Sequence, residues 1–165
     1  MRQIIIPQNY TSILSIYETQ KAISLLKRLF EDRLGGALRL HRVSAPLFVS
    51  ASSGLNDDLN GVERPVAFDI NGVEDTAQVV HSLAKWKRFA LKRYQFQPGE
   101  GLYTDMNAIR RDEELDNLHS AYVDQWDWEK IISREDRNKE YLKQTVRSIV
   151  GALADTQYFL RCVFP

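Results

Sequence analysis

The first amphipathic pattern of the chain covers residues 11–34. Apolar residues recur there at intervals of three and four, which is the spacing of one face of an α-helix. Because Gly35-Gly36 is a common stop signal, we predict that this helix ends there and that the following segment, ALRLHRV, forms a strand up to Pro46. The apolar face of the helix consists of Ala22, Leu25, Leu26 and Leu29.

Two further helices are predicted, one in the middle of the chain and one near its end. Ser82 stands where a helix N-cap is expected, ahead of an apolar stripe that includes Lys87. Residues 133–136 resemble a capping box and precede a second stripe, which predicts a helix to about residue 159. The first stripe contains Leu83, Trp86, Lys87 and Ala90, and the second contains Leu142, Val146, Ile149, Val150 and Leu153.

Segments 102–110 and 119–128 are rich in aromatic and β-branched residues, as strands are. The polar run RDEELDNL separates them, so we predict a hairpin with a long loop. If Arg110 lies opposite His119, alternation separates a polar face from a packing face, and the mixture of charges on the polar face favours ligand binding. The polar face would hold Thr104, Arg110, His119, Gln125 and Asp127, and the packing face Tyr122, Trp126 and Trp128.

Residues 50–68 are dominated by Ser, Gly, Asn and Asp, a composition that predicts a loop. Asn71-Gly72 then marks a tight turn between short strands near 66–70 and 76–80. Asp57 and Asp58 lie in the loop, where the simplest interpretation of adjacent carboxylates is that both face water.

Lys87 is a cation inside an apolar stripe, and the pattern leaves two interpretations open. Its stem can pack against the core while the ammonium group reaches water. Alternatively, the ammonium points into a pocket, where an anionic ligand offsets the cost of removing it from water.

The composition predicts one soluble globular unit of 165 residues. Twenty-two basic and 22 acidic residues leave no net charge, which argues against broad electrostatic attraction to nucleic acid or to an anionic membrane. The single cysteine, Cys162, excludes an internal disulfide and a cysteine-rich zinc site, and we expect a buried thiol. The apolar run in the opening ten residues is too short for a signal peptide or a membrane span, so we expect a cytoplasmic protein.

The runs VVHSLAKWKR, GEGLYT and HSAYVDQWDWE closely resemble the aspartate–ammonia ligase family, the ammonia-dependent asparagine synthetases. The resemblance runs from about residue 17 to about residue 153. It implies an α+β fold in which an antiparallel sheet is flanked by helices, similar to the catalytic core of class II aminoacyl-tRNA synthetases. Residues of about 17–46 resemble motif 1, which forms a homodimer interface in that fold, and about 102–128 resemble motif 2.

Only the amino-terminal part of the family's chain is matched. No G-x-G-x-x-R run, as in motif 3, follows Asp127. We therefore expect residues 1–165 to form an incomplete part of one catalytic domain and to be inactive alone.

The resemblance implies a reaction in two steps. The side-chain carboxylate of L-aspartate attacks the α-phosphorus of ATP to give β-aspartyl-AMP and pyrophosphate, and ammonia then displaces AMP to give asparagine. Mg²⁺ is implied as the partner of the ATP phosphates, although no cluster of metal ligands is visible in this chain.

The resemblance also assigns roles to single residues. Arg110 matches the motif 2 arginine, whose planar fork can bridge the α-phosphate and the substrate carboxylate; Arg111, which begins the loop, is less suited. Lys87 would pair with a carboxylate of aspartate. Asp57 would hold the amino group of aspartate, with Asp58 as the alternative if the loop is shifted by one residue. Ser82 and Gln125 would hydrogen-bond the amino acid, Asp112 would help to position the nucleotide, and His119 would stack on adenine.

Two other classes of protein stay open at this point. The missing motif 3 favours a non-catalytic class II-like module for dimerisation or regulation. A fragment of an aspartyl- or asparaginyl-tRNA synthetase is the third reading, but that protein would need an anticodon-binding barrel ahead of motif 1, and there is no room for one before Tyr17.

Overall fold

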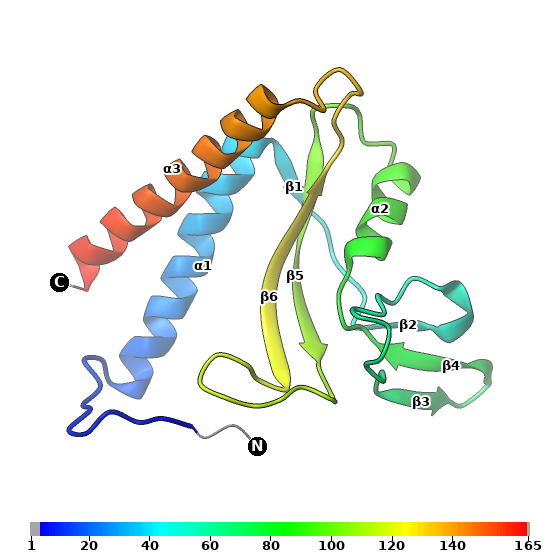
Figure 1. Cartoon of the computed structure of the whole chain (residues 1–165), viewed down its shortest axis with the longest axis horizontal. Helices are drawn as coiled ribbons and strands as arrows, with labels where there is room; N and C mark the ends of the chain where they lie inside the picture. The colour runs from blue at the N-terminus through cyan, green and yellow to red at the C-terminus, as the bar shows by residue number, and fades with distance from the viewer. Residues whose placement is uncertain (1–3, 165) are drawn as a thin grey trace. The chain divides into compact units, whose positions relative to one another are not determined.

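A computed structural model describes residues 4–164 of the chain (Figure 1). The first three residues of the opening segment lie outside that range. The fold is α+β, with long helices and two three-stranded sheets, and the chain divides into two compact units. One unit contains Arg42–Phe96 and Leu102–Glu129 with the start of the chain, and the other contains Pro7–His41, Gln97–Gly101 and the residues from Lys130 on.

Helix α1 spans Ile16–Leu38 and begins at a capping box. The Ser15 hydroxyl accepts from the backbone N–H of Glu18 (3.2 Å), and the Glu18 carboxylate accepts from the N–H of Ser15 (2.9 Å). The predicted end at Gly35-Gly36 is wrong. Buried Leu38 keeps the next turn helical, and the helix closes only at Arg39, whose φ of 57° is left-handed.

Helix α3 spans Lys139–Val163 and packs along α1 (Figure 1). Its N-cap is Asn138, so the predicted capping box at residues 133–136 does not start the helix, although the Ser133 hydroxyl does accept from the N–H of Asp136 (3.1 Å). The buried positions of α3 are Ala152 and Thr156.

The apolar stripe predicted for this helix is not its buried face, since Leu142, Val146, Val150 and Leu153 are exposed. Cys162 is exposed too, contrary to the prediction of a buried thiol. Between residues 4 and 164, no helix combines the length and apolar character that a membrane crossing requires.

The smaller sheet has the order β2-β4-β3. Its strands are β2 (Phe48–Ser50), β3 (Ala67–Ile70) and β4 (Val73–Val79), and a 3₁₀ turn, η1 (Ala51–Ser53), follows β2. The predicted turn is confirmed: Ile70 pairs with Val73 across Asn71-Gly72, and Gly72 has a φ of 79° that suits a residue without a Cβ.

The larger sheet has the order β1-β5-β6, with β1 at Leu40–Arg42, β5 at Gly101–Ile109 and β6 at Tyr122–Lys130. The N–H of Arg110 donates to the carbonyl of Ala121 (2.7 Å). The predicted pairing of Arg110 with His119 is therefore wrong by two residues. A shift of two leaves the strand residues on their predicted faces, because strand side chains alternate with a period of two; His119 is the exception, since it precedes β6.

Helix α2 (Ala84–Arg93) belongs to the same unit as this hairpin. Its N-cap is Leu83 rather than Ser82. The buried core of the unit joins residues before α2 to residues of β5, so the hairpin face that carries Thr104 and Arg110 is the face turned to the core. This core consists of Val49, Val80, Leu83, Met106 and Ala108.

Candidate functional site

A cavity of about 410 Å³ lies in the unit that contains the β5-β6 hairpin. Three segments line it: the loop that precedes β3, the short stretch after β4 that contains His81, and the loop that follows β5. Both signs of charge face the space. The lining residues are Leu59, Asn60, Glu63, His81, Arg110, Arg111, Asp112 and Glu113.

Arg110 directly follows β5, and its side chain is about two-thirds buried (32% exposed). One guanidinium nitrogen, Nη1, lies 3.7 Å from the carboxylate of Glu113. The Nε–H is buried and has no hydrogen-bond partner within the described part of the chain. A buried charged donor without an acceptor is costly, so this side of Arg110 suits an anionic ligand that enters the cavity.

Asp112, on the wall of the cavity, is held by Arg64. Its carboxylate accepts from the backbone N–H of Arg64 (2.8 Å) and forms a two-point pair with the guanidinium (3.0 and 2.5 Å). These hydrogen bonds hold the pKa of Asp112 well below its usual range and raise the pKa of Arg64. The carboxylate is thus fixed and ionised, and its predicted contact with a nucleotide stays a prediction.

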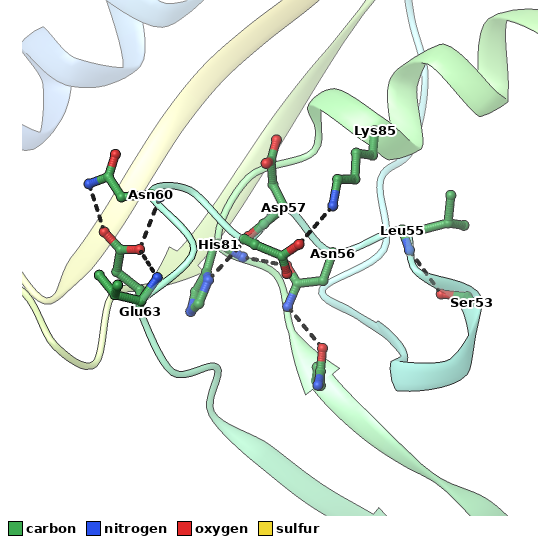
Figure 2. A network of polar contacts seen from close by, with 11 residues as sticks. Ser53, Leu55, Asn56, Asp57, Asn60, Glu63, His81 and Lys85 are labelled. Atoms are coloured by element: carbon green, nitrogen blue, oxygen red, sulfur yellow. Dashed lines mark hydrogen bonds and ion pairs between the residues drawn. The ribbon is translucent and has the colours of Figure 1, made fainter.

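The loop before β3 is anchored by Asn56, which is buried (Figure 2). Its side-chain oxygen accepts from the backbone N–H of His81 (2.9 Å), and its amide nitrogen donates to Gln78 and to the carbonyl of Val79 (both 3.3 Å). The next residues are therefore held against the end of β4.

Further along this loop, Glu63 accepts from the backbone and side-chain N–H groups of Asn60 (3.0 and 2.9 Å). Hydrogen bonds from its own backbone N–H and from Asn60 and Val62 lower the pKa of Glu63. The loop is therefore tied within itself as well as to β4.

The two adjacent aspartates of the loop differ in their partners. The carboxylate of Asp58 pairs with Lys85 Nζ at 3.0 Å. The backbone carbonyl of Asp57 lies 3.3 Å from Nδ1 of His81, and Asp57 is only half-buried. Since Lys85 already occupies Asp58, the geometry favours Asp57 over Asp58 as the residue that could hold a substrate amino group.

Lys87 is buried, with 1% of its side chain exposed, and its Nζ lies 2.5 Å from the carboxylate of Asp127. The interpretation in which the ammonium reaches water is therefore wrong. Asp127 lies on the predicted polar face of the hairpin but was not among the predicted site residues. The buried Thr104 on the same face of β5 has a hydroxyl without a partner among residues 4–164.

The predicted polar face of the hairpin is long, and its site residues do not all lie at one place along it. Thr104 and Arg110 are six positions apart on one strand, which separates their Cα atoms by about 20 Å. Gln125, two positions before Asp127 on β6, lies part-way along the face and is half-buried. The Ser82 hydroxyl accepts from the N–H of Ala84 (3.3 Å).

His119 is not on the strand face, because β6 begins only at Tyr122. Its side chain is about half exposed, and its Nδ1 lies 2.7 Å from the Asp116 carboxylate in the loop. It does not line the cavity. Stacking of His119 on adenine stays a prediction that would need the loop to bring the ring to the nucleotide.

Within residues 4–164, the side chains do not form a cluster that could hold a resident metal ion. Over the described range, no three His, Cys, Asp or Glu side chains gather closely enough to hold one. No chemical step is therefore assigned to magnesium in this chain.

The prediction overlooked five residues that line the cavity, and it also overlooked Asn56, the buried anchor of the loop before β3. The five are Leu59, Asn60, Glu63, His81 and Glu113. His81 directly precedes Ser82 in the run HSLAKWKR, so the signal that selected Ser82 and Lys87 also covered it. Asn56 precedes Asp57, but nothing in a loop sequence reveals which amide is buried.

The sequence of this chain is similar to that of known proteins. The family model for aspartate–ammonia ligase matches residues 17–165. The chain is 62% identical over 166 aligned positions to an aspartate–ammonia ligase from Clostridium perfringens, and 57% identical to one from Lactobacillus johnsonii; the alignments cover 100% and 98% of this chain but 49% and 48% of those proteins. The chain thus spans about half the length of these relatives.

Among solved structures, a pyrrolysyl-tRNA synthetase from Desulfitobacterium hafniense matches with a TM-score of 0.52 and 14% identity, over 84% of this chain and 52% of that one. At that identity the likeness concerns the fold alone. The α+β, class II aminoacyl-tRNA synthetase-like fold is therefore confirmed.

Proposed function

The chain belongs to the aspartate–ammonia ligase family, and we propose that it contributes to an enzyme that joins ammonia to L-aspartate, with ATP converted to AMP and pyrophosphate. The observation that carries the proposal is the 62% identity along the whole chain to a ligase of this name. The cavity beside Arg110, with its unsatisfied buried Nε–H, supports it.

The chemistry requires one anion to attack another. An ionised carboxylate is a poor electrophile, so it must first be linked to AMP, and its approach to the α-phosphate must be screened by cations. Arg110 is suited to bridge both groups, since its fork offers two-point contacts that a lysine cannot reproduce. Lys87, Asp57, Ser82 and Gln125 would orient the aspartate, and Asp112 and His119 the nucleotide.

The remaining features of the proposal concern assembly and setting. Residues of about 17–46 and about 102–128 would be motifs 1 and 2 of one catalytic domain, and the relatives' greater length leaves room for motif 3 outside this chain. A homodimer would form through motif 1, where Tyr17, Ile23 and Leu26 of α1 are exposed. Mg²⁺ would accompany ATP, and the enzyme would work in the cytoplasm.

Product analysis on the complete protein tests the activity. Incubation with ATP, L-aspartate and heavy-nitrogen ammonium should give asparagine labelled in its side-chain amide, with one AMP for each asparagine. Formation of ADP in place of AMP, or unlabelled asparagine, would overturn the proposal.

Arg110→Lys tests the role of the guanidinium. It keeps the charge but loses the fork, and removal of one preorganised donor costs about 10²–10³ in rate. We expect aspartate-dependent exchange of pyrophosphate into ATP to fall by about that factor, with aspartate binding less affected. Arg42→Lys is the matched control, because Arg42 pairs with Asp105 (3.0 Å), which lies on the other face of β5. Equal exchange in the Arg110 variant and in the unmodified protein would show that the phosphate assignment is wrong.

A further inference from the structure

His81 is a buried histidine with one ring nitrogen unused. The residue is 1% exposed and lines the cavity together with Arg110. Its Nε2 is buried and has no hydrogen-bond partner among the residues that the structure describes. Buried polar atoms in proteins are nearly always satisfied, so an unsatisfied one on a cavity wall indicates a ligand contact.

The other contacts of His81 decide which proton the ring carries. Nδ1 lies 3.3 Å from the carbonyl of Asp57, and the backbone N–H of His81 donates to Asn56 (Figure 2). A carbonyl oxygen can only accept, so this hydrogen bond requires the proton on Nδ1. In the neutral ring, Nε2 then presents a lone pair to the cavity.

The lone pair on Nε2 can accept a hydrogen bond only from a donor group, and this requirement limits which substrate group can lie beside it. The inference that follows rests on the proposed function. The phosphates of ATP and the carboxylates of aspartate offer acceptors, which a lone pair repels. The adenine amino group and the ribose hydroxyls of ATP are donors, but they belong to the nucleoside and take no part in the bond changes at the carboxyl group. The donors at the reacting centre are ammonia and the amino group of aspartate, and Asp57 is the predicted partner of that amino group. We propose that Nε2 of His81 is the base that removes a proton from ammonia as it attacks the aspartyl adenylate.

The step balances without any further reactant. The nitrogen lone pair of ammonia forms a bond to the acyl carbon, and the carbonyl π pair moves onto oxygen. Nε2 takes one proton from the nitrogen, which is now positively charged. The electron pair on the carbonyl oxygen then re-forms the carbonyl. At the same time the bond between the acyl carbon and the phosphate oxygen breaks, and AMP leaves with the electrons of that bond. The protonated imidazole returns its proton to water.

Two substitutions in the complete protein separate the two ring nitrogens. In His81→Asn, the amide nitrogen can replace Nδ1 as the donor to the Asp57 carbonyl, whereas nothing occupies the position of Nε2. In His81→Gln, the longer side chain reaches the Nε2 position but offers no base. His41→Asn is the control, since His41 is exposed in β1 outside the cavity.

We expect both His81 variants to form asparagine about 10²–10⁴-fold more slowly, the range for loss of a general base, while aspartate-dependent pyrophosphate exchange stays within about threefold of the unmodified protein. Hydroxylamine, a stronger nucleophile whose adduct loses its proton readily to water, should restore much of the lost rate.

Three results would overturn the inference. A parallel fall of exchange and ligation would show a structural role. A raised KM for aspartate in the exchange reaction would show that His81 binds the amino group instead. Ligation at the normal rate would show no role at all. Failure of the proposed function itself looks different, because the unmodified protein would then show no aspartate-dependent exchange.

Discussion

The buried pair of Lys87 and Asp127 gives the sharpest stability prediction, through the variant Asp127→Asn. The substitution keeps the shape of the side chain and one acceptor oxygen, but it removes the negative charge 2.5 Å from the ammonium group. Lys87 is then a buried cation without a counter-charge, since only 1% of its side chain reaches solvent.

Removal of one partner from a buried pair costs about 3–5 kcal/mol. Because 22% of the Asp127 side chain is exposed and water can partly replace its charge, we take the lower end, about 3 kcal/mol. In a chain of 165 residues this corresponds to a melting temperature lower by roughly 6–12 °C.

The reverse change, Lys87→Met, should cost less. It leaves Asp127 unpaired, but Asp127 can reach water, and the methionine fills most of the volume of the lysine stem. The order of the two variants therefore tests the burial argument independently of their absolute values.

Urea unfolding of the 165-residue chain, followed by tryptophan fluorescence, measures both losses. Asp58→Asn is the matched control: it breaks the exposed pair with Lys85, whose side chains are 43% and 79% exposed, and should cost no more than about 1 kcal/mol. A loss below that value for Asp127→Asn, or a larger loss for Lys87→Met than for Asp127→Asn, would refute the reasoning.

Two further predictions concern Asp112 on the cavity wall and Asn56, which anchors the loop before β3. Because Arg64 holds the pKa of Asp112 below its ordinary value, the pair stabilises the fold above the unfolded-state pKa of about 3.9, and this contribution is lost as pH falls through the folded-state value. The difference in unfolding free energy between the unmodified chain and Arg64→Gln should therefore shrink as pH is lowered below 4, and a carbon NMR titration should place the Asp112 carboxyl near its ordinary pKa only in the variant; the same low pKa in both would contradict this. Asn56→Ala should lower the unfolding free energy by about 1–3 kcal/mol, because the buried N–H of His81 loses its acceptor, whereas Asn107→Ala, at an exposed position, should change it by no more than about 0.5 kcal/mol; equal losses would argue against the loop anchor.

The elements that the sequence predicted well are those with a strong local pattern. Asn71-Gly72 specifies its turn because Gly72 tolerates positive φ, and the alternation in β5 and β6 specifies the faces even though the register was wrong by two residues. The end of α1 was missed because a buried residue, Leu38, outweighs the local preference of Gly35 and Gly36.

The stripe of α3 was predicted as packing, and it repeats correctly at helical spacing, but the buried positions of the helix are Ala152 and Thr156. Small residues permit close contact between helices. An apolar stripe in the sequence does not indicate which other element will cover it. Local sequence therefore predicted the helix but not its packing.

The site shows the same division. Lys87 was selected from sequence as a cation inside an apolar stripe and Arg110 by its match to the motif 2 arginine, and both are largely buried. Two pairings of the site were not predicted: Asp127 with Lys87, and Arg64 with Asp112, which join residues 40 and 48 positions apart. Pairing over that distance depends on how α2 and the loop before β3 fold onto the hairpin, which no local pattern encodes.

The central claim is that the aspartate carboxylate attacks the α-phosphorus beside Arg110. Transfer of heavy oxygen from the side-chain carboxylate of labelled aspartate, followed by mass spectrometry of the products of the complete protein, tests it directly. One labelled oxygen should appear in the phosphate of each AMP. Label in inorganic phosphate, or AMP that carries none, would contradict the claim.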